Sequence, residues 1–446
     1  MEVKPGYKQT EAGVIPEGWD AVPLKGKVGI AHGFAFASEH FASHGPYRLA
    51  TPGHFYEAGG FRDIGEKQKY YVGPVPCDYV LQPGDVIVAM TEQADGLLGS
   101  AAVIPDEQGY LHNQRLGRVL VLSPKIQLDY LVYVFNSPNY RAKVRETAAG
   151  TKVKHTSPEK LLEISVRLPP CPEQRAIAEA LSDVDALLGG LDRLIAKKRG
   201  LKQAAMQQLL TGQTRLPGFS GEWKVKRLGD VGEISSSGVD KKNRPGEEPV
   251  RLVNYMDVYR RAFIYSNDLN HWVTAPSHQL GRCAVQKGDV FFTPSSETRD
   301  DIANSAVAME DIEEAAYSYH VVRLRLREPW DLRFRTYAFK TRVFLSQAET
   351  LCDGGGTRYV LSQGRFRNLT VKIPPFPEQT AIAEVLSEMD AELGALEQRR
   401  EKTRALKQGM MQELLTGRTR LVETAPLKTA KARSSATAES NPKTVP

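Results

Sequence analysis

Four short loops carry the residue types that could do chemistry. Two lie in the first half of the chain, "TEQADGLLGS" from Thr91 and "LHNQRLG" from Leu111, and two in the second half, "SSETRDDIANS" from Ser295 and "YSYH" from Tyr317. They offer Arg, Asn, Gln, Ser and Thr, whose side chains hydrogen-bond to the edges of DNA bases. Since any of these residues could also belong to an ordinary polar turn, the loops indicate a binding surface without fixing its contacts.

The basic and polar residues of the two halves give a set of candidate DNA contacts. In chain order they are Arg48, Thr91, Gln93, Asn113, Gln114, Arg115, Lys152, Lys154, Arg251, Asn254, Thr298, Arg299, Tyr319, His320 and Arg358. The run "VVRLRLR" from Val321 predicts a strand with one buried face. Its other face would carry Arg323, Arg325 and Arg327 toward either phosphates or solvent.

No stretch of the sequence assembles a catalytic site. "LPPC" at Leu168 and "IPPF" at Ile373 resemble the Asn/Asp-Pro-Pro-Tyr/Phe loop of amino-methyltransferases, but an aliphatic residue replaces the polar one that would bind the amine. "DGGGTRYV" from Asp353 lacks both the dinucleotide and the P-loop glycine patterns. The four cysteines form no CxxC pair. We therefore expect a binding protein with no catalytic residue, metal or cofactor of its own.

An internal repeat predicts the elements that must position these loops. Pro169 to Leu216 and Pro374 to Leu421 match at 30 of 48 positions without a gap. Each copy predicts a long helix, with a proline at its start and Gly212 or Gly417 beyond its end. Apolar residues step by four and three along both copies, as in a coiled coil. These seam residues are Ile177, Leu181, Val184, Leu188 and Leu191, and Ile382, Leu386, Met389, Leu393 and Leu396.

The two helices can pair antiparallel, which would relate the halves of the chain by an approximate two-fold axis; two independent core helices are the alternative. Short β-branched runs precede each helix, with one further helix expected around residues 130–145 and one around 332–347. The fold class is therefore α+β, with mostly β globular domains. The expected division is 1–168, first globular domain; 169–216, first helix; 217–373, second globular domain; 374–421, second helix; and 422–446, a disordered tail.

The globular segments share landmarks but differ in their loops. Trp19 corresponds to Trp223, and "QPGDVIVAM" from Gln82 corresponds to "QKGDVFFTP" from Gln286. Variable loops on a shared framework are typical of two halves that recognise different targets, although drift after duplication would give the same pattern.

Composition sets only broad limits. A net charge of +6 is compatible with nucleic-acid binding and does not demonstrate it. No apolar run has the length of a membrane span, and the first residues do not form a signal peptide, so we expect a cytoplasmic protein.

With these residues assembled, the chain resembles the specificity subunit of type I restriction-modification systems. The resemblance covers nearly the whole chain and rests on the twice-present "PPxPEQ" with its helix ending in "LLTG", on "IPEGW" at Ile15, and on the "GD" strands. It implies two target-recognition domains, each binding one half of a split, asymmetric double-stranded DNA site. It also implies that the two helices dock two methyltransferase subunits, which carry S-adenosylmethionine, and that restriction subunits can join. The tail after Leu421 has no counterpart in this pattern.

Two other readings remain open. One is a coiled-coil scaffold whose globular domains bind proteins; the other is an enzyme that acts alone. Salt-dependent binding of duplex DNA separates the first alternative from the resemblance, and methyl transfer or cleavage by the isolated chain would support the second.

Overall fold

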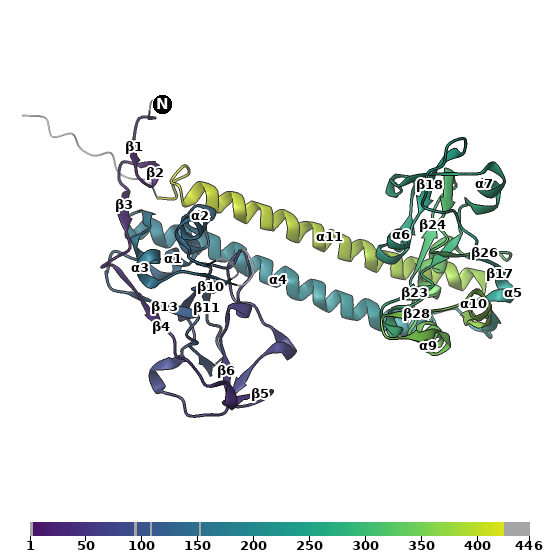
Figure 1. The fold of residues 1–446 in the computed structure, drawn as a ribbon, viewed down its shortest axis with the longest axis horizontal. Helices are drawn as coiled ribbons and strands as arrows, with labels where there is room; N and C mark the ends of the chain where they lie inside the picture. Colours follow the sequence, from purple (N-terminus) through teal and green to yellow (C-terminus); the bar gives the residue numbers. More distant parts are fainter. Residues whose placement is uncertain (1–2, 93–95, 108, 151–152, 423–446) are drawn as a thin grey trace, which may run out of the picture. The chain divides into compact units, whose positions relative to one another are not determined.

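The computed structural model describes residues 3–92, 96–107, 109–150 and 153–422 (Figure 1). The expected α+β class is confirmed. The chain divides into two compact units, Met1–Gly189 with Glu401–Pro446, and Gly190–Arg400. Two long helices, α4 (Cys171–Leu209) and α11 (Phe376–Leu414), contribute to both units. The unit boundaries therefore fall inside the helices, whereas the sequence suggested boundaries at the helix ends.

The first globular segment holds two sheets. One has the order β11-β9-β13-β4, formed by Ala101–Val103, Val86–Ala89, Leu116–Val121 and Val28–His32. The other has the order β5-β7-β6-β12-β8, formed by Phe41–Ala42, Tyr70–Tyr71, Tyr47–Leu49, Tyr110–Leu111 and Val80–Leu81. The remaining strand pairs are β1 (Tyr7–Thr10) with β2 (Gly13–Pro16), β3 (Asp20–Pro23) with β15 (Ser165–Leu168), and β10 (Thr91–Glu92) with β14 (Lys154–His155).

The second globular segment repeats this plan with three sheets. The first has the order β17-β26-β22-β24-β19, formed by Gly232–Ser235, Val322–Leu326, Val290–Phe292, Ser305–Ala308 and Phe263–Ile264. The second has the order β20-β18-β25-β21, formed by Trp272–Ala275, Glu248–Val253, Ile312–Tyr317 and Ala284–Val285. The third joins β23 (Ser295–Ser296), β28 (Arg358–Val360) and β27 (Asp353–Gly355), and β16 (Lys224–Arg227) pairs with β29 (Thr370–Ile373).

Short helices cover the sheets of both segments. In the first they are α1 (Leu128–Phe135), α2 (Pro138–Thr147) and α3 (Pro158–Glu163); in the second they are α5 (Leu228–Val231), α6 (Tyr255–Arg260), α7 (Ser277–Cys283), α8 (Leu332–Ala338), α9 (Arg342–Leu351) and α10 (Gln363–Asn368). The helix expected around 130–145 is thus two helices, because the Ser137 hydroxyl caps a new helix with Pro138 at its first position. The Thr341 cap divides α8 from α9 in the same way.

The two arginines of β26, Arg323 and Arg325, do not face phosphate or solvent as expected, whereas Arg327, just after the strand, is exposed. Its sheet has apolar core on both faces, with Leu324 in one cluster and Val321 in the other. Arg323 is buried and donates to the carbonyl oxygens of Arg282 and Ala284. Arg325 donates to Asp289 over 2.7 Å. The alternation therefore reflects internal ion pairing and carbonyl bonding.

The long helices run antiparallel within each unit. In the first unit Lys407, near the end of α11, pairs with Asp185 in the first half of α4. In the second unit Lys202, near the end of α4, pairs with Asp390 in the first half of α11. The seam residues Ile177, Leu181, Leu191, Ile382, Leu386 and Leu393 are buried, and Val184, Leu188, Met389 and Leu396 are half-buried. Within the described residues, no helix combines the length and apolar character needed to cross a membrane.

A buried carboxylate joins three segments in the first unit. Glu173, in the first turn of α4, is 1% exposed. It accepts from the indole N–H of Trp19 over 2.9 Å and from the Arg420 guanidinium over 2.7 Å. The guanidinium also lies 5.8 Å from the centre of the Trp19 ring. We call this cluster the first clamp, since it ties the globular segment to the start of one helix and to residues beyond the end of the other.

The second unit contains the same cluster. Glu378, in the first turn of α11, is 1% exposed and accepts from Trp223 over 3.0 Å and from Arg215 over 2.6 Å. Arg215 follows the end of α4, as Arg420 follows the end of α11. This second clamp shows that the two units repeat the junction between globular segment and helices as well as the helices themselves.

Candidate nucleic-acid interface

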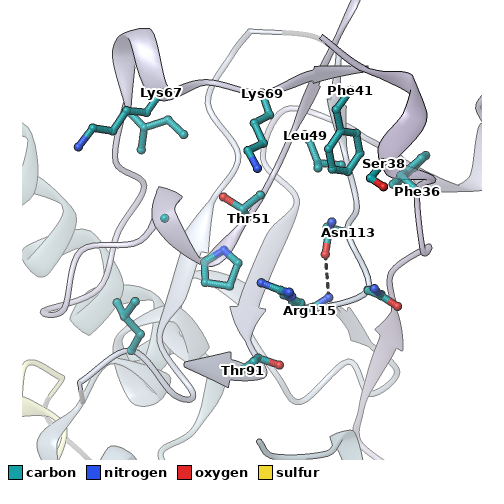
Figure 2. A pocket seen from close by; sticks show the side chains of 15 residues that line it. Phe36, Ser38, Phe41, Leu49, Thr51, Lys67, Lys69, Thr91, Asn113 and Arg115 are labelled. Atoms are coloured by element: carbon teal, nitrogen blue, oxygen red, sulfur yellow. Dashed lines mark hydrogen bonds between the residues drawn. The ribbon is translucent and has the colours of Figure 1, made fainter. Parts of the chain in front are cut away.

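A cavity of about 650 Å³ opens in the first globular segment (Figure 2). Its wall combines apolar, polar and basic side chains: Phe36, Ser38, Phe41, Leu49, Thr51, Pro52, Gly53, Ile64, Lys67, Lys69, Thr91, Leu97, Asn113, Gln114 and Arg115. A smaller cavity of about 330 Å³ shares Thr91, Gln114 and Arg115 and adds Val153 and His155. Four residues singled out from the sequence, Thr91, Asn113, Gln114 and Arg115, therefore lie together.

The residues at the centre belong to a tight turn between β12 and β13, His112–Leu116, which we call the first tip turn. Its backbone is held from two sides. The Leu116 N–H donates to the Asn113 carbonyl over 2.9 Å, and the Arg115 N–H donates to Asn113 Oδ1 over 3.0 Å. Two further bonds connect the turn to Phe34: Phe34 N–H to His112 O, 2.8 Å, and Gln114 N–H to Phe34 O, 3.0 Å.

A glycine and a buried histidine complete the support of this turn. A Cβ on Gly33 would stand 2.1 Å from the Asn113 carbonyl oxygen, so only glycine allows this approach. His112 is 1% exposed, and its Nε2 lies 3.0 Å from the Leu116 carbonyl. Burial lowers the pKa of His112 to about 4, so the ring is neutral near pH 7 and donates to that carbonyl. The turn is a rigid platform for the side chains at its tip.

The walls of the cavity are fixed by separate contacts. Lys69 Nζ lies 5.7 Å from the centre of the Phe41 ring, and Figure 2 shows it pointing into the cavity while Lys67 lies at the edge. On the opposite side, the Thr91 hydroxyl lies 3.3 Å from His155 Nδ1. The buried carboxylate of Glu92 accepts from the backbone N–H of Leu97 and of Leu98, each over 2.7 Å. These contacts hold the wall without using the side chains of Gln114 or Arg115.

The second globular segment contains an equivalent turn, Tyr317–Val321, the second tip turn. Val321 N–H donates to Ser318 O over 3.0 Å, and His320 N–H donates to Ser318 Oγ over 3.2 Å. Val239 takes the place of Phe34: its N–H donates to Tyr317 O over 2.8 Å, and its carbonyl accepts from Tyr319 N–H over 3.2 Å.

Gly238 allows the same close approach as Gly33, since a Cβ there would stand 2.3 Å from the Ser318 carbonyl carbon. The four bonds made by the backbone N–H groups of the first tip turn and Phe34 thus have counterparts in the second, at an offset of 205 residues, obtained from 321 − 116. The bond of His112 Nε2 has none, because Tyr317 donates to Ser235 Oγ instead.

Polar and basic residues surround the second tip turn. Tyr319 is 47% exposed, and its ring centre lies 3.9 Å from that of His320. Burial, and then the positive charges of Lys241 and Arg358, lower the pKa of His320. Three residues singled out from the sequence, Tyr319, His320 and Arg358, therefore lie close enough to interact, and Lys241 joins them.

Other sequence candidates have partners inside the protein. Arg48 pairs with Glu107 and is absent from the cavity wall. Arg251 donates to Ser266 and to the carbonyl of Glu313. Asn254 is the residue before α6: its backbone N–H donates to Asp257, and its side-chain amide lies 2.9 Å from His271 Nδ1. These bonds give all three a structural role, and their assignment as DNA contacts stays a prediction.

The remaining candidates from the sequence do not lie together in the structure. Arg299, which follows Thr298 at the start of a short turn, donates to the carbonyl of Glu349 over 2.9 Å. Lys154 lies in β14 beside Glu92, outside the cavity wall. Gln93 and Lys152 lie outside the described residues.

Sequence reasoning missed Lys67, Lys69, Phe36 and Phe41 in the first segment and Lys241 in the second. No strand pattern marked the two lysines, because Lys67 ends a short 3-10 helix and Lys69 lies just before β7. His40 and His44 are spaced like a metal-binding pair, a pattern passed over in the sequence. In the described part of the chain, however, no group of three or more His, Cys, Asp or Glu could hold a metal ion.

Comparison with known proteins gives consistent matches. The family model of the type I restriction modification DNA specificity domain matches residues 16–196 and 220–404. The MjaVIII specificity subunit of Methanocaldococcus jannaschii is 28% identical over 211 residues, 47% of this chain and 49% of that protein. The EcoBI specificity subunit of Escherichia coli is 27% identical over 45% of this chain and 40% of that protein. The chain thus spans about half, or less, of the length of these two relatives.

Longer matches exist at lower identity. The putative MjaX specificity subunit of Methanocaldococcus jannaschii is 22% identical over 93% of this chain and 97% of that protein. The crystal structure of a type I restriction-modification S subunit from M. genitalium superposes with a TM-score of 0.54 at 14% identity, over 93% of this chain and 98% of that one, and supports the fold. Since the two family matches cover most of the sequence, the chain belongs to the type I restriction modification DNA specificity family.

Proposed function

We propose that this chain is the DNA-recognition subunit of a type I restriction-modification complex and has no catalytic activity of its own. The observation that carries the proposal is the pair of tip turns. Each globular segment presents polar side chains on a rigid turn, and basic residues lie beside it: Lys69 and Arg115 in the first segment, Lys241 and Arg358 in the second. Binding to base edges and phosphates requires hydrogen-bond donors that have no partner inside the protein, together with positive charge beside them.

The target would be double-stranded, bipartite and asymmetric. Each globular segment would read a few base pairs, and because the side chains of the two tip turns differ, the half-sites would differ. The helices α4 and α11 have 39 residues each. At 1.5 Å per residue each is roughly 58 Å long. We propose that this length sets the unread gap, so inserting one heptad into each helix should lengthen the gap in the methylated motif.

The partners would be two methyltransferase subunits, which bring S-adenosylmethionine, and restriction subunits, all in the cytoplasm. Support for docking comes from α4, where Leu187, Leu194 and Leu201 recur every seven residues and are 43%, 38% and 48% exposed. A line of exposed leucines on one helix suits a partner helix. Leu194→Asp with Leu201→Asp should reduce co-purification with the methyltransferase subunit. Leu122→Asp, at an exposed leucine of the first segment, is the control.

The experiment that tests DNA recognition measures duplex affinity against salt, with the chain in complex with its methyltransferase subunit. The logarithm of affinity should fall linearly with the logarithm of salt concentration. Lys69→Ala with Arg115→Ala should reduce the slope by roughly 2 if both side chains contact the DNA backbone, and by about 1 if Arg115 contacts a base. Lys125→Ala, which removes an exposed charge away from the cavity, should leave the slope unchanged.

Two results would contradict the proposal. Absence of duplex binding, or binding that ignores salt, would favour a protein-binding scaffold. Methyl transfer by the chain in the absence of any methyltransferase subunit would show that it is an enzyme.

A further inference from the structure

The two tip turns share their backbone and differ at their tips. Of the five positions from His112 to Leu116, Asn113 and its counterpart Ser318 do the same work, since each side-chain oxygen accepts the backbone N–H two residues on. The next two positions are Gln114 and Arg115 in the first turn, and Tyr319 and His320 in the second. The two copies within this chain therefore share the hydrogen bonds that hold the turn and differ in the two residues at its tip.

We propose that these two positions are the specificity-determining pair of each globular segment, and that in the first half-site Arg115 specifies a guanine and Gln114 an adenine. The proposal rests on the proposed function and adds to it which residues discriminate between bases. It also states which bases the first pair selects.

In the first turn, the hydrogen bonds distinguish the side chains that are free to contact a base from the side chain that holds the turn. Asn113 Oδ1 accepts from the Arg115 N–H, and this bond turns its amide toward the backbone of the turn and away from a base edge. The side chains of Gln114 and Arg115 are exposed, and no hydrogen bond or ion pair occupies them in the described structure. Asn113 is accordingly a positioning residue, and the next two residues are the readers.

The chemistry of the two free side chains selects the bases. A guanidinium donates two parallel hydrogen bonds to O6 and N7 of guanine, and a carboxamide matches N6 and N7 of adenine. Lys69, pointing into the cavity beside them, has a single point charge suited to a phosphate. An adenine held by Gln114 stays stacked in the duplex, whereas a methyltransferase extrudes its target base. The adenine read by Gln114 is thus distinct from the methylated one.

The second pair has less capacity to discriminate. A tyrosine hydroxyl has its donor and acceptor at one atom, and a neutral imidazole has them on two ring nitrogens that point in different directions, so neither makes the paired contact of Arg or Gln. Their rings lie 3.9 Å apart between centres, which gives them apolar surface for a thymine methyl group or a base face. Substitutions at Tyr319 and His320 should therefore change the second half-site by a smaller factor than substitutions at Gln114 and Arg115 change the first.

The test is the methylated motif of the intact complex, read by sequencing of methylated bases in DNA that contains all variants of both half-sites. Arg115→Ala should reduce the preference for guanine at one position of the first half-site by roughly 5- to 150-fold, and Gln114→Ala should do the same at an adenine. The second half-site should be unchanged. His320→Ala should relax one position of the second half-site alone.

Two control variants distinguish a base contact from a phosphate contact and test which base is selected. Lys69→Ala should weaken binding to all sequences equally and leave the motif unchanged, as expected for a phosphate contact. Gln114→Glu should exchange the preference for adenine for one for cytosine, whose amino group a carboxylate accepts. Melting temperatures of these variants equal to that of the unaltered protein would show that substitutions at these exposed positions do not affect folding.

The outcomes separate the inference from the proposed function. If the unaltered complex methylates a bipartite motif but Arg115→Ala and Gln114→Ala leave that motif intact, or relax a position other than guanine and adenine, the inference is wrong and the proposed function stands. If the unaltered complex neither binds nor methylates a specific motif, the proposed function itself fails.

Discussion

The first and second tip turns are the same backbone carrying different side chains. Four hydrogen bonds and one glycine contact recur with distances that agree within a few tenths of an ångström, yet none of the five residues is identical between His112–Leu116 and Tyr317–Val321. The comparison teaches that the shared structure is fixed by backbone amides, by a glycine, and by a short side chain with an acceptor oxygen, and does not depend on the two residues at the tip. Recognition residues can then change without disturbing the fold.

The clamps provide the strongest test of equivalence between the units. Glu173→Ala and Glu378→Ala each leave a guanidinium and an indole N–H without their buried acceptor. Each substitution should lower the free energy of unfolding by about 3 to 5 kcal/mol. Denaturant unfolding measures both, with Glu→Gln at each position as the milder control. A large loss for one variant and none for the other would show that the clamps are not equivalent.

Burial of His112 should make the stability of the first unit fall in acid. Its pKa falls from 6.5 to about 4 on folding because of burial, so the folded state disfavours the charged ring. The stabilisation is complete above pH 6.5 and is lost as the pH falls toward 4, on the order of 2 to 3 kcal/mol in total. The counterpart, Tyr317, carries no charge in this range. Unfolding of His112→Gln as a function of pH should lack this slope; an unchanged slope would assign it to other groups.

The glycines behind the tip turns should respond alike. Gly33→Ala and Gly238→Ala each place a methyl group against a backbone carbonyl, 2.1 Å from an oxygen and 2.3 Å from a carbon. The turn must shift, at a cost of about 1 to 3 kcal/mol. Thermal melting measures the loss, and methylated-motif sequencing should show that each variant affects only its own half-site. Gly394→Ala, at an open helical position, is the control.

The smallest change in stability should come from a position where the two units already have different residues in the same left-handed backbone conformation. Gly99 has φ +76°, and Ala303, its counterpart 204 residues later, has φ +63°. Gly99→Ala introduces left-handed strain and a contact of 3.0 Å with Val144, and should destabilise by about 1 to 2 kcal/mol. Ala303→Gly relieves the strain but loses a buried methyl group, so its net effect should stay within about 1 kcal/mol. A larger loss for Ala303→Gly than for Gly99→Ala would contradict this account.

The sequence predicted elements whose signals are local. The helix starts follow from the heptad spacing and the prolines before it, and α4 and α11 begin two residues after the expected starts at Pro169 and Pro374. The polar loops were also identified, because Asn, Gln and Arg between strands are visible directly. The resemblance to type I specificity subunits, which rests on repeated motifs, is confirmed.

Other features depend on contacts between distant residues and could not be read from the chain. Nothing local distinguishes Arg251, which bonds to carbonyl oxygens, from Arg115, whose side chain is uncommitted. The burial of Arg323 depends on a second apolar cluster over its sheet. The two tip turns are equivalent because of their backbone hydrogen bonds to Phe34 and Val239. Comparing the residue types of the two turns does not reveal this equivalence.

The clamps also impose an order on synthesis. Every residue of the second clamp, from Arg215 to Glu378, is synthesised before the Arg420 that the first clamp requires. The unit Gly190–Arg400 is continuous, whereas the other unit combines Met1–Gly189 with residues made last. Although its strands emerge first, the amino-terminal globular segment is therefore the last to be secured. A released chain that ends before Arg420 contains every residue of the second clamp and lacks one residue of the first.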